Sequence, residues 1–345
     1  MSALNIKVQN DRIINVTDTL IYLSNCATNN REASFFIDES PDLECVYIGE
    51  ELFIDFLRSF CDRCSFDPKK ISIEIENLIQ SECWPNLTKC YRSVDVFYGQ
   101  SVDFKCNKDI KYKTSMFVGG SRWPRLSLAS FLYANYRDDS LITYHQSLKD
   151  RNQPCYLYMD DLFKHHMLQG VDNNLLEQVK DFVGALPLHL DQDDHKGNDF
   201  ITIEGKNLGY INFDQAYKLV PWYNQVYCDI VCETVHNGQT FAFTEKIARC
   251  WLTKTPFLAF APKNYLANLR RLGFETFDLF WSEHYDNYEN VNRIKMIQGL
   301  IKQIHGMNLK ELGQIYQSSA MQKILDNNLR VFKSLTQEKI LDCFN

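Results

Sequence analysis

Four residues in the middle of the chain carry side chains that suit phosphate and sugar hydroxyls. Glu233 follows an apolar run, Val226 to Cys232, and Thr244, Glu245 and Lys246 follow a polar loop. Thr244 can cap a helix that begins at Glu245, because its hydroxyl can accept from a free backbone N–H group. The N–H groups of a first helical turn attract anions, and Lys246 adds a full positive charge. We therefore expect a phosphate here, with Glu245 placed for a hydroxyl such as that of a ribose.

A second group of candidates follows another strand-like run, residues 114–118. The chain continues through two glycines into Ser121, Arg122 and Arg125, where a helix is expected to begin. Strand, glycine turn and helix in this order open a Rossmann-like unit. An arginine is unfavourable at the N-terminus of a helix unless it shares an anion with that helix. Arg122 and Arg125 therefore indicate an anion at the same place.

Either group alone has an ordinary explanation. A Glu245–Lys246 pair on a helix is common on protein surfaces, and three residues make a weak motif. Together the two groups would bring two helix N-termini and two or three cations to one cleft. A nucleoside diphosphate carries about two negative charges, so this set of charges would match it.

The pattern Glu233…Thr244-Glu245-Lys246 resembles the donor-binding motif of α1,3-fucosyltransferase-like glycosyltransferases, and more closely that of a group of phage and viral glycosyltransferases. The similarity continues through the apolar run Phe257 to Phe260, which is expected to be a strand, into residues 265–281, and it also covers residues 117–133. Fucose itself is not implied, because the N-terminal acceptor motifs of fucosyltransferases are not visible. The resemblance implies a nucleotide-sugar donor and a donor site made of Ser121, Arg122, Arg125, Glu233, Thr244, Glu245 and Lys246. Arg125 and Lys246 would be the catalytic pair that neutralises the diphosphate.

Composition sets the broad class of the protein. The chain has 345 residues, 45% hydrophobic and 23% charged, with a formal net charge of −7. This is an ordinary globular mixture, and the charge argues against a protein whose whole surface follows nucleic acid. The 12 cysteines are scattered, which favours free thiols in a reducing compartment. No N-terminal apolar run has the length of a signal peptide or a membrane span. We expect a cytoplasmic protein, in the host cytoplasm if its source is viral.

Alternating strand-like and helix-like segments predict the α/β class. We expect two Rossmann-like domains facing a cleft, the GT-B-like arrangement, with C-terminal helices. Residues 1–110 would form the acceptor-binding domain and residues 111–308 the nucleotide-sugar donor-binding domain. Residues 309–345 would be C-terminal helices that can pack back on the first domain. Within the first domain, residues 19–23 are expected to form a strand and residues 50–61 a helix, while residues 71–79 leave strand and helix open.

Four further clusters could bind other partners. Asp191, Asp193 and Asp194 resemble a metal-binding DxD motif, but a solvated acidic loop is the preferred interpretation, and the same holds for residues 160–166. Cys61 and Cys64 have zinc spacing without suitable partners. We therefore expect no cofactor and no essential divalent metal. The lysines of residues 105–113 could contact a polyanion or belong to an interdomain linker.

The function that combines these features is a glycosyltransferase that moves a sugar from a nucleotide-sugar to a hydroxyl acceptor. The acceptor would be a glycan or a hydroxymethylated base in phage DNA. Two alternatives remain open, a nucleotide-sugar-binding protein without turnover and a structural virion protein.

Overall fold

The structure of the protein is a computed structural model. It describes residues 3–9, 12–37, 42–90, 107–119, 121–144, 173–188, 190, 202–203, 206–207, 219, 221–236 and 238–344. The chain divides into two compact units. The first holds Met1–Asp95, Asn237–Ala242 and Leu335–Asn345, and the second holds Val96–His236 and Phe243–Ser334. This division begins the second unit earlier than the predicted boundary near residue 110, and it gives the first unit two later segments of the chain.

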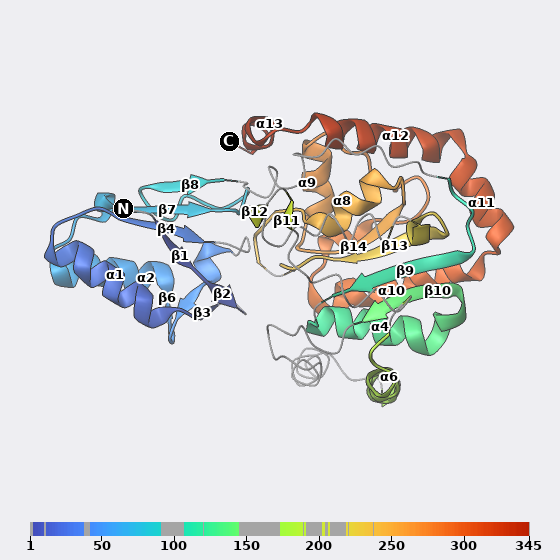
Figure 1. Cartoon of the computed structure of the whole chain (residues 1–345), viewed down its shortest axis with the longest axis horizontal. Helices are drawn as coiled ribbons and strands as arrows, with labels where there is room; N and C mark the ends of the chain where they lie inside the picture. Colours follow the sequence, from blue (N-terminus) through green and yellow to red (C-terminus); the bar gives the residue numbers. More distant parts are fainter. Residues whose placement is uncertain are drawn as a thin grey trace. The chain divides into compact units, whose positions relative to one another are not determined.

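The first unit is built on a parallel sheet of order β1-β4-β7-β8. Its strands are β1 (Leu4–Ile6), β4 (Ala33–Ile37), β7 (Ile71–Ile75) and β8 (Leu87–Lys89). The helices α1 (Val16–Thr28) and α2 (Phe53–Cys64) lie in the connections between them, on the same side of the sheet (Figure 1). A second, mixed sheet has the order β2-β3-β5-β6, with strands β2 (Val8–Gln9), β3 (Arg12–Ile13), β5 (Tyr47–Ile48) and β6 (Glu51–Leu52).

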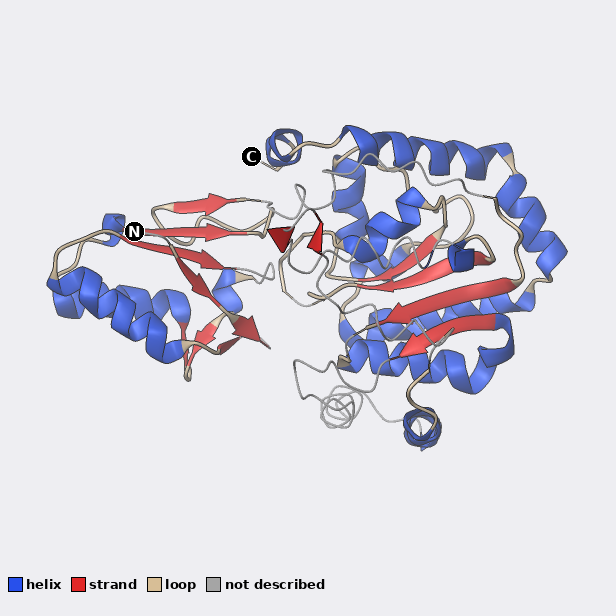
Figure 2. Cartoon of the chain, viewed as in Figure 1, coloured by secondary structure: helices blue, strands red, loops and turns tan. Residues whose placement is uncertain are grey.

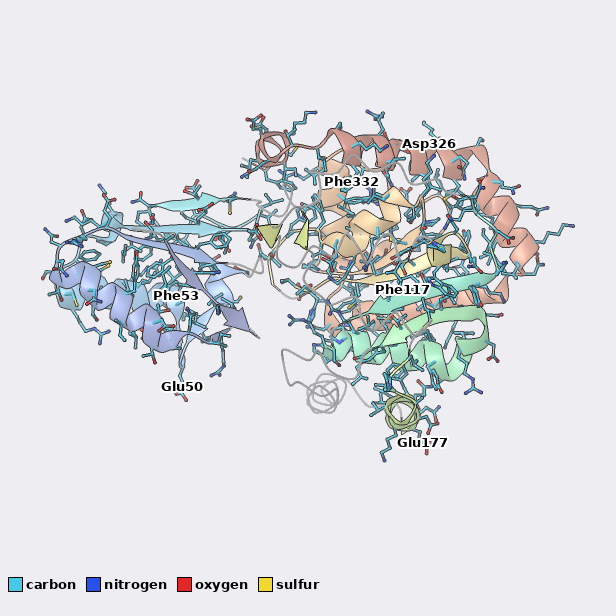
Figure 3. All side chains as sticks on the ribbon, in the orientation of Figure 1. Glu50, Phe53, Phe117, Glu177, Asp326 and Phe332 are labelled. Atoms are coloured by element: carbon cyan, nitrogen blue, oxygen red, sulfur yellow. The ribbon has the colours of Figure 1, made fainter. Side chains whose placement is uncertain are left out.

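Alternating side chains explain why these two connecting helices cover one face only. In β4 and β7 every second residue is buried, including Phe35 and Ile73, and the residues between them are partly exposed or exposed. A strand with this period of two has one core face. Phe53, the first residue of α2, is fully buried and packs edge-on against Phe35 (Figure 3). The expected Rossmann-like domain would be wound on both faces, and the connecting helices of this sheet leave one face without that layer.

Residues 19–23 belong to α1, so the strand expected there is wrong. Their β-branched and aromatic residues suit a strand, but Thr19, Leu23 and Cys26 are the buried positions, at spacings of four and three. That spacing places them on one face of a helix. The ambiguous residues 71–79 begin as strand β7, whose alternation decided the outcome.

The second unit contains a four-stranded parallel sheet of order β10-β9-β13-β14 (Figure 2). Its strands are β9 (Tyr112–Val118), β10 (Ser140–Tyr144), β13 (Val226–Cys232) and β14 (Phe257–Phe260). Every residue of β10, β13 and β14 is buried. Strands covered on both faces have continuous apolar runs, and this is why β13 and β14 were predicted with the correct ends. Residues 202–207 contain a separate two-stranded antiparallel sheet, β11 (Thr202–Ile203) and β12 (Lys206–Asn207).

Helices cover both faces of the larger sheet. They are α4 (Trp123–Tyr136), α6 (Asn173–Gly184), α8 (Glu245–Leu252), α9 (Tyr265–Arg271), α10 (Asn290–Gly306), α11 (Leu309–Gln317) and α12 (Ser319–Ser334). On one face α10 packs on α4, and on the other α12 packs on α8 (Figure 1). Trp251 of α8 stacks on Phe274 at 3.9 Å between ring centroids, and Phe332 of α12 packs against the same indole (Figure 3).

The helices after residue 308 are divided between the units. Helices α11 and α12 belong to the second unit, where α11 packs on β9 and β13. Helix α13 (Gln337–Asp342) belongs to the first unit. There the Lys89 side chain donates to the Phe344 carbonyl at 3.4 Å, and the rings of Phe344 and Phe241 lie 5.3 Å apart. Only this last part of residues 309–345 therefore packs on the N-terminal strands.

Candidate functional site

The candidate site lies where the central strands β9 and β13 end. These neighbours are parallel, so their carboxyl ends share one edge of the sheet. From β9 the chain crosses through α4 to β10, and from β13 it crosses through α8 to β14, in opposite directions. Such crossovers are right-handed, so the two helices lie on opposite faces (Figure 1). In open α/β sheets, ligands bind at the carboxyl edge where the strand order reverses in this way.

A buried carboxylate fixes the N-terminus of α8. The Thr244 hydroxyl accepts from the backbone N–H of Lys246 at 3.3 Å and donates to Glu233 Oε2 at 2.5 Å. Glu233 Oε1 accepts from the Thr244 backbone N–H at 3.2 Å and from the Tyr265 hydroxyl at 2.8 Å. Glu233 is 1% exposed. Three donors therefore hold this carboxylate inside the protein, and it in turn holds the helix cap.

Lys246 and Glu245 form a partly exposed ion pair at the start of α8. The Lys246 ammonium donates to Glu245 Oε1 at 2.8 Å, to Thr244 Oγ1 at 3.1 Å and to Thr234 Oγ1 at 3.2 Å. Burial acts to raise the pKa of Glu245, but the charges of Lys246 and Arg249 outweigh it and lower that pKa to about 2. Glu245 is therefore an ionised carboxylate at any physiological pH.

Arg125 reaches the same place from α4. Its guanidinium, on a side chain that is buried, donates through Nη2 to the Cys232 carbonyl at 3.3 Å and to Thr234 Oγ1 at 3.4 Å. Thr234 Oγ1 thus accepts from both Arg125 and Lys246. Burial raises the pKa of the Cys232 thiol to about 11, although both cations act to lower it. The structure therefore brings together the two cations that the sequence analysis selected from distant segments.

Ser121 and Arg122 are placed differently. The hydroxyls of Ser121 and Tyr144, the last residue of β10, lie 2.5 Å apart. Arg122 is the N-cap residue of α4 in extended conformation, and its carbonyl accepts from Leu126 N–H at 2.9 Å. Ser121 therefore ties the start of α4 to β10. Gly120 lies outside the described residues.

Two contributors were missed by the sequence analysis. Thr234 was placed in the polar loop after β13 without a role, and it turns out to be the shared acceptor of both cations. Tyr265 was part of a recognised segment, and it turns out to hold Glu233. The first residues after a central strand can reach the carboxyl edge, and Thr234 is the second residue after β13, so it had a usable signal. The contact of Tyr265 with a residue 32 positions earlier had none.

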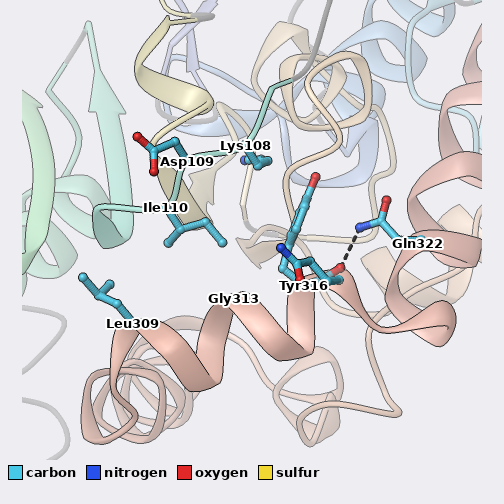
Figure 4. A pocket seen from close by; sticks show the side chains of 8 residues that line it. Lys108, Asp109, Ile110, Leu309, Gly313, Tyr316 and Gln322 are labelled. Carbon is cyan, nitrogen blue, oxygen red and sulfur yellow. Dashed lines mark hydrogen bonds between the residues drawn. The ribbon is translucent and has the colours of Figure 1, made fainter.

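A hollow of about 440 Å³ lies at the other end of the same sheet (Figure 4). It is lined by Lys108, Asp109, Ile110, Leu309, Gly313, Tyr316, Gln317 and Gln322. Lys108 there donates to the carbonyl of Val226, the first residue of β13, whereas the candidate site follows Cys232, the last residue of that strand. This hollow is therefore separate from the cation pair.

Two lysines of the basic stretch 105–113 have internal partners. Lys108 donates to the Tyr223 carbonyl at 2.6 Å and to Thr255 Oγ1 at 2.8 Å. Lys113 pairs with Asp139 at 3.1 Å and donates to the His305 carbonyl at 2.9 Å. These contacts favour the interpretation of the stretch as part of the fold over that of a polyanion site. Lys105 lies outside the described residues.

Among the described residues, no group of three or more histidine, cysteine or carboxylate side chains is arranged to hold a metal ion. Cys61 is buried in α2 and Cys64 is exposed at its end. The clusters at residues 160–166 and 191–195 lie outside the described residues. No helix in the described part of the chain has the length and apolar character needed to cross a bilayer.

Comparison of the chain with known protein families gave no match, and comparison with curated proteins gave none either. Functional inference therefore depends on the geometry of the site. That geometry offers two cations, an ionised carboxylate and hydroxyl groups at the carboxyl edge of a parallel sheet.

Proposed function

We propose that the second unit binds the diphosphate of a nucleotide-sugar, and that the protein is a glycosyltransferase acting on a hydroxyl acceptor. The observation that carries the proposal is the meeting of Arg125 and Lys246 on Thr234 Oγ1. Because both cations donate to the same oxygen, Arg125 Nη2 and Lys246 Nζ can be no farther apart than the sum of the two hydrogen-bond distances. A diphosphate spreads about two negative charges over neighbouring oxygens, so one ligand can satisfy both cations.

Each side chain then has a defined task. Negative charge grows on the diphosphate as the glycosidic bond breaks, and Arg125 and Lys246 would stabilise it at that moment. Glu245 would exchange its contact with Lys246 for a hydroxyl of the ribose, since an ionised carboxylate is a good acceptor. Glu233 would act through Thr244, as a positioning residue that keeps the helix start in place.

The acceptor side of the proposal belongs to the first unit. In a GT-B-like arrangement this unit would present the acceptor, and one of its carboxylates would deprotonate the acceptor hydroxyl if the reaction inverts configuration. A glycan and a hydroxymethylated base in phage DNA are the two acceptors proposed. Since two protein cations neutralise the diphosphate, the reaction would need no essential divalent metal.

The proposal is tested by a thermal-shift screen of nucleotide-sugars followed by an assay of nucleoside diphosphate release. Release is measured with a glycan acceptor and with hydroxymethylated duplex DNA. Lys246→Ala should lower turnover by about 100-fold or more, because it removes a charge that acts where negative charge develops.

Lys254→Ala is the matched control. It removes a lysine that pairs with Asp326 at 2.6 Å, just beyond the other end of α8. This variant should keep near-normal turnover. Equal activity of the two variants, or failure of every nucleotide-sugar to stabilise the protein, would contradict the proposal. Stabilisation without any release would instead indicate a nucleotide-sugar-binding protein.

A further inference from the structure

Two threonine hydroxyls accept from the same ammonium, yet they differ in what they do with their own proton. Thr244 Oγ1 accepts from the Lys246 side chain and backbone and donates to Glu233 Oε2. A hydroxyl has two lone pairs and one proton, so Thr244 is fully used. Its position is therefore set entirely by protein groups.

Thr234 Oγ1 also accepts twice, from Arg125 Nη2 at 3.4 Å and from Lys246 Nζ at 3.2 Å. Both of its lone pairs face cations, so its proton must point away from them. In the part of the chain that the structure describes, this hydroxyl donates to no protein acceptor. Thr234 is only partly buried, so an oxygen of a ligand can reach the proton.

The two cations that donate to Thr234 Oγ1 attract an anion to its proton, while Glu245 offsets part of the charge of Lys246. A hydroxyl that accepts from two charged donors is polarised by both, and hydrogen bonds in such chains strengthen one another. Thr234 follows β13 and its neighbour Glu233, at the carboxyl edge between the crossovers of the sheet. An oxygen that accepts the Thr234 proton would lie across Oγ1 from the two donors, and other oxygens of the same diphosphate would contact the guanidinium and the ammonium.

We propose that Thr234 is a phosphate-binding residue, which donates to a diphosphate oxygen while its lone pairs hold Arg125 and Lys246 at the correct spacing. This assignment rests on the proposed function and adds to it a third donor, one that neither charge nor a helix N-terminus supplies. Thr234 also contributes to the close approach of the two cations. The hydroxyl oxygen accepts from both of them.

The test uses the full chain, with inorganic pyrophosphate and a stabilising nucleoside diphosphate as the probes. Thr234→Val keeps the shape of the side chain and removes the hydroxyl, and Thr234→Ser keeps the hydroxyl. Calorimetric affinity for both probes should fall about 10- to 100-fold in Thr234→Val, the effect of losing a hydrogen bond to a charged group. Thr234→Ser should recover most of it.

Thr255→Val is the control for a purely structural effect. Thr255 also carries a hydroxyl that accepts from a lysine, Lys108 at 2.8 Å, at the opposite end of the sheet. This variant should lose thermal stability without losing affinity for pyrophosphate. Where turnover is measured, Thr234→Val should lower kcat more than it raises KM, because the cations act mainly on the developing charge.

The outcomes separate two failures. If the wild-type chain binds a nucleoside diphosphate and folded Thr234→Val binds it equally well, this inference is overturned and the proposed function stands. If Thr234→Ser stays as weak as Thr234→Val, the hydroxyl is not the cause and the inference also fails. If the wild-type chain binds neither probe, the proposed function fails and this inference fails with it.

Discussion

Glu245 is the residue whose ionisation most directly reports the state of the cation cluster. Lys246 and Arg249 outweigh the effect of burial and lower its pKa to about 2, from 4.5 in an unstructured chain. A carboxylate whose pKa is lower in the folded state stabilises the fold fully above the unfolded pKa, and this contribution is lost as the pH falls towards the folded pKa. The window for Glu245 is therefore from about pH 4.5 down to about pH 2.

Glu245→Gln should therefore be less stable than the wild type near neutral pH, by up to about 3 kcal/mol. The difference should shrink as the pH falls through that window, measured as the free energy of unfolding in urea. The variant must be compared with the wild type at each pH, because both contain Asp229. Burial raises the pKa of Asp229, so its contribution to stability changes with pH in the opposite direction to that of Glu245. A constant difference between pH 6 and pH 2.5 would show that Glu245 does not ionise as described.

The sequence predicted which residues form the site better than it predicted their hydrogen-bond partners. Glu233 was recognisable because it follows a strand end, and Thr244, Glu245 and Lys246 were recognisable because they form a helix cap and first turn. Their meeting with Arg125 was expected because two helix N-termini and their cations would face one cleft, and the shared acceptor Thr234 shows that Lys246 and Arg125 lie close together. Hydrogen-bond partners such as Tyr265 depend on packing between distant segments, and no local pattern encodes them.

Helix α10 is held to the sheet by a neutral histidine near its end. The His305 ring stacks on Tyr136 of α4 at 4.0 Å, and its Nε2 lies 3.0 Å from the Thr114 hydroxyl of β9. Burial and the charge of Lys113 lower the pKa of His305 to about 4, while Asp139 acts to raise it. Protonation would place a charge between these elements.

Lowering the pH should therefore destabilise the packing of α10, and this should begin at a pH well above the pKa of an ordinary carboxylate. A histidine with a lowered pKa binds its proton more readily in the unfolded chain, so stability is lost as the pH falls from about 6.5 to about 4. The loss should reach roughly 3 kcal/mol at most and should be absent in His305→Gln. Urea unfolding at pH 7 and pH 5 measures it. A variant that keeps the wild-type dependence over this range would contradict the role of His305.

The helices and strands differed in how well they could be predicted from their own residues. Strands β13 and β14 have unbroken apolar runs and were predicted to the residue. Strand β10 is also fully buried but was not predicted, because Ser140 and Thr143 interrupt its apolar run. In α1, residues with strand preference form a helix because their buried positions share one helical face. In α1, tertiary packing overrode local preference.

A loop of the second unit contains a segment that belongs to the first unit. The segment Asn237–Ala242 belongs to the first unit, although it links β13 to α8 of the second. Thr234 stands before this segment and Thr244 stands after it. No local pattern could reveal this, because the polar loop around Gly238 looks like an ordinary turn. The predicted domain boundaries therefore could not include it.

Contacts within the first unit fix the segment firmly. The Asn77 side chain donates to the Gln239 carbonyl at 2.9 Å and accepts from the Phe241 backbone N–H at 3.2 Å. The Gln239 backbone N–H donates to Asp42 at 3.0 Å. Gly238 has a φ of +77°, and a Cβ atom on it would lie 3.0 Å from the Asp42 Cβ. The conformation of the loop between the two site threonines is thus set by the first unit.

Asn77→Ala should therefore weaken diphosphate binding, although Asn77 belongs to the unit that does not hold the cations. Losing both contacts leaves the segment held by fewer hydrogen bonds and lets Thr234 and Thr244 move more, so the ligand must restore their order at an entropic cost. A loss of about 3- to 10-fold in affinity for pyrophosphate is expected, corresponding to roughly 1 kcal/mol. Ile73→Val is the control, since it costs about 0.5–1.5 kcal/mol in the core of the same unit without touching the segment. If Asn77→Ala loses stability but binds pyrophosphate as tightly as Ile73→Val does, then the loop does not connect the fold of one unit to the binding site of the other.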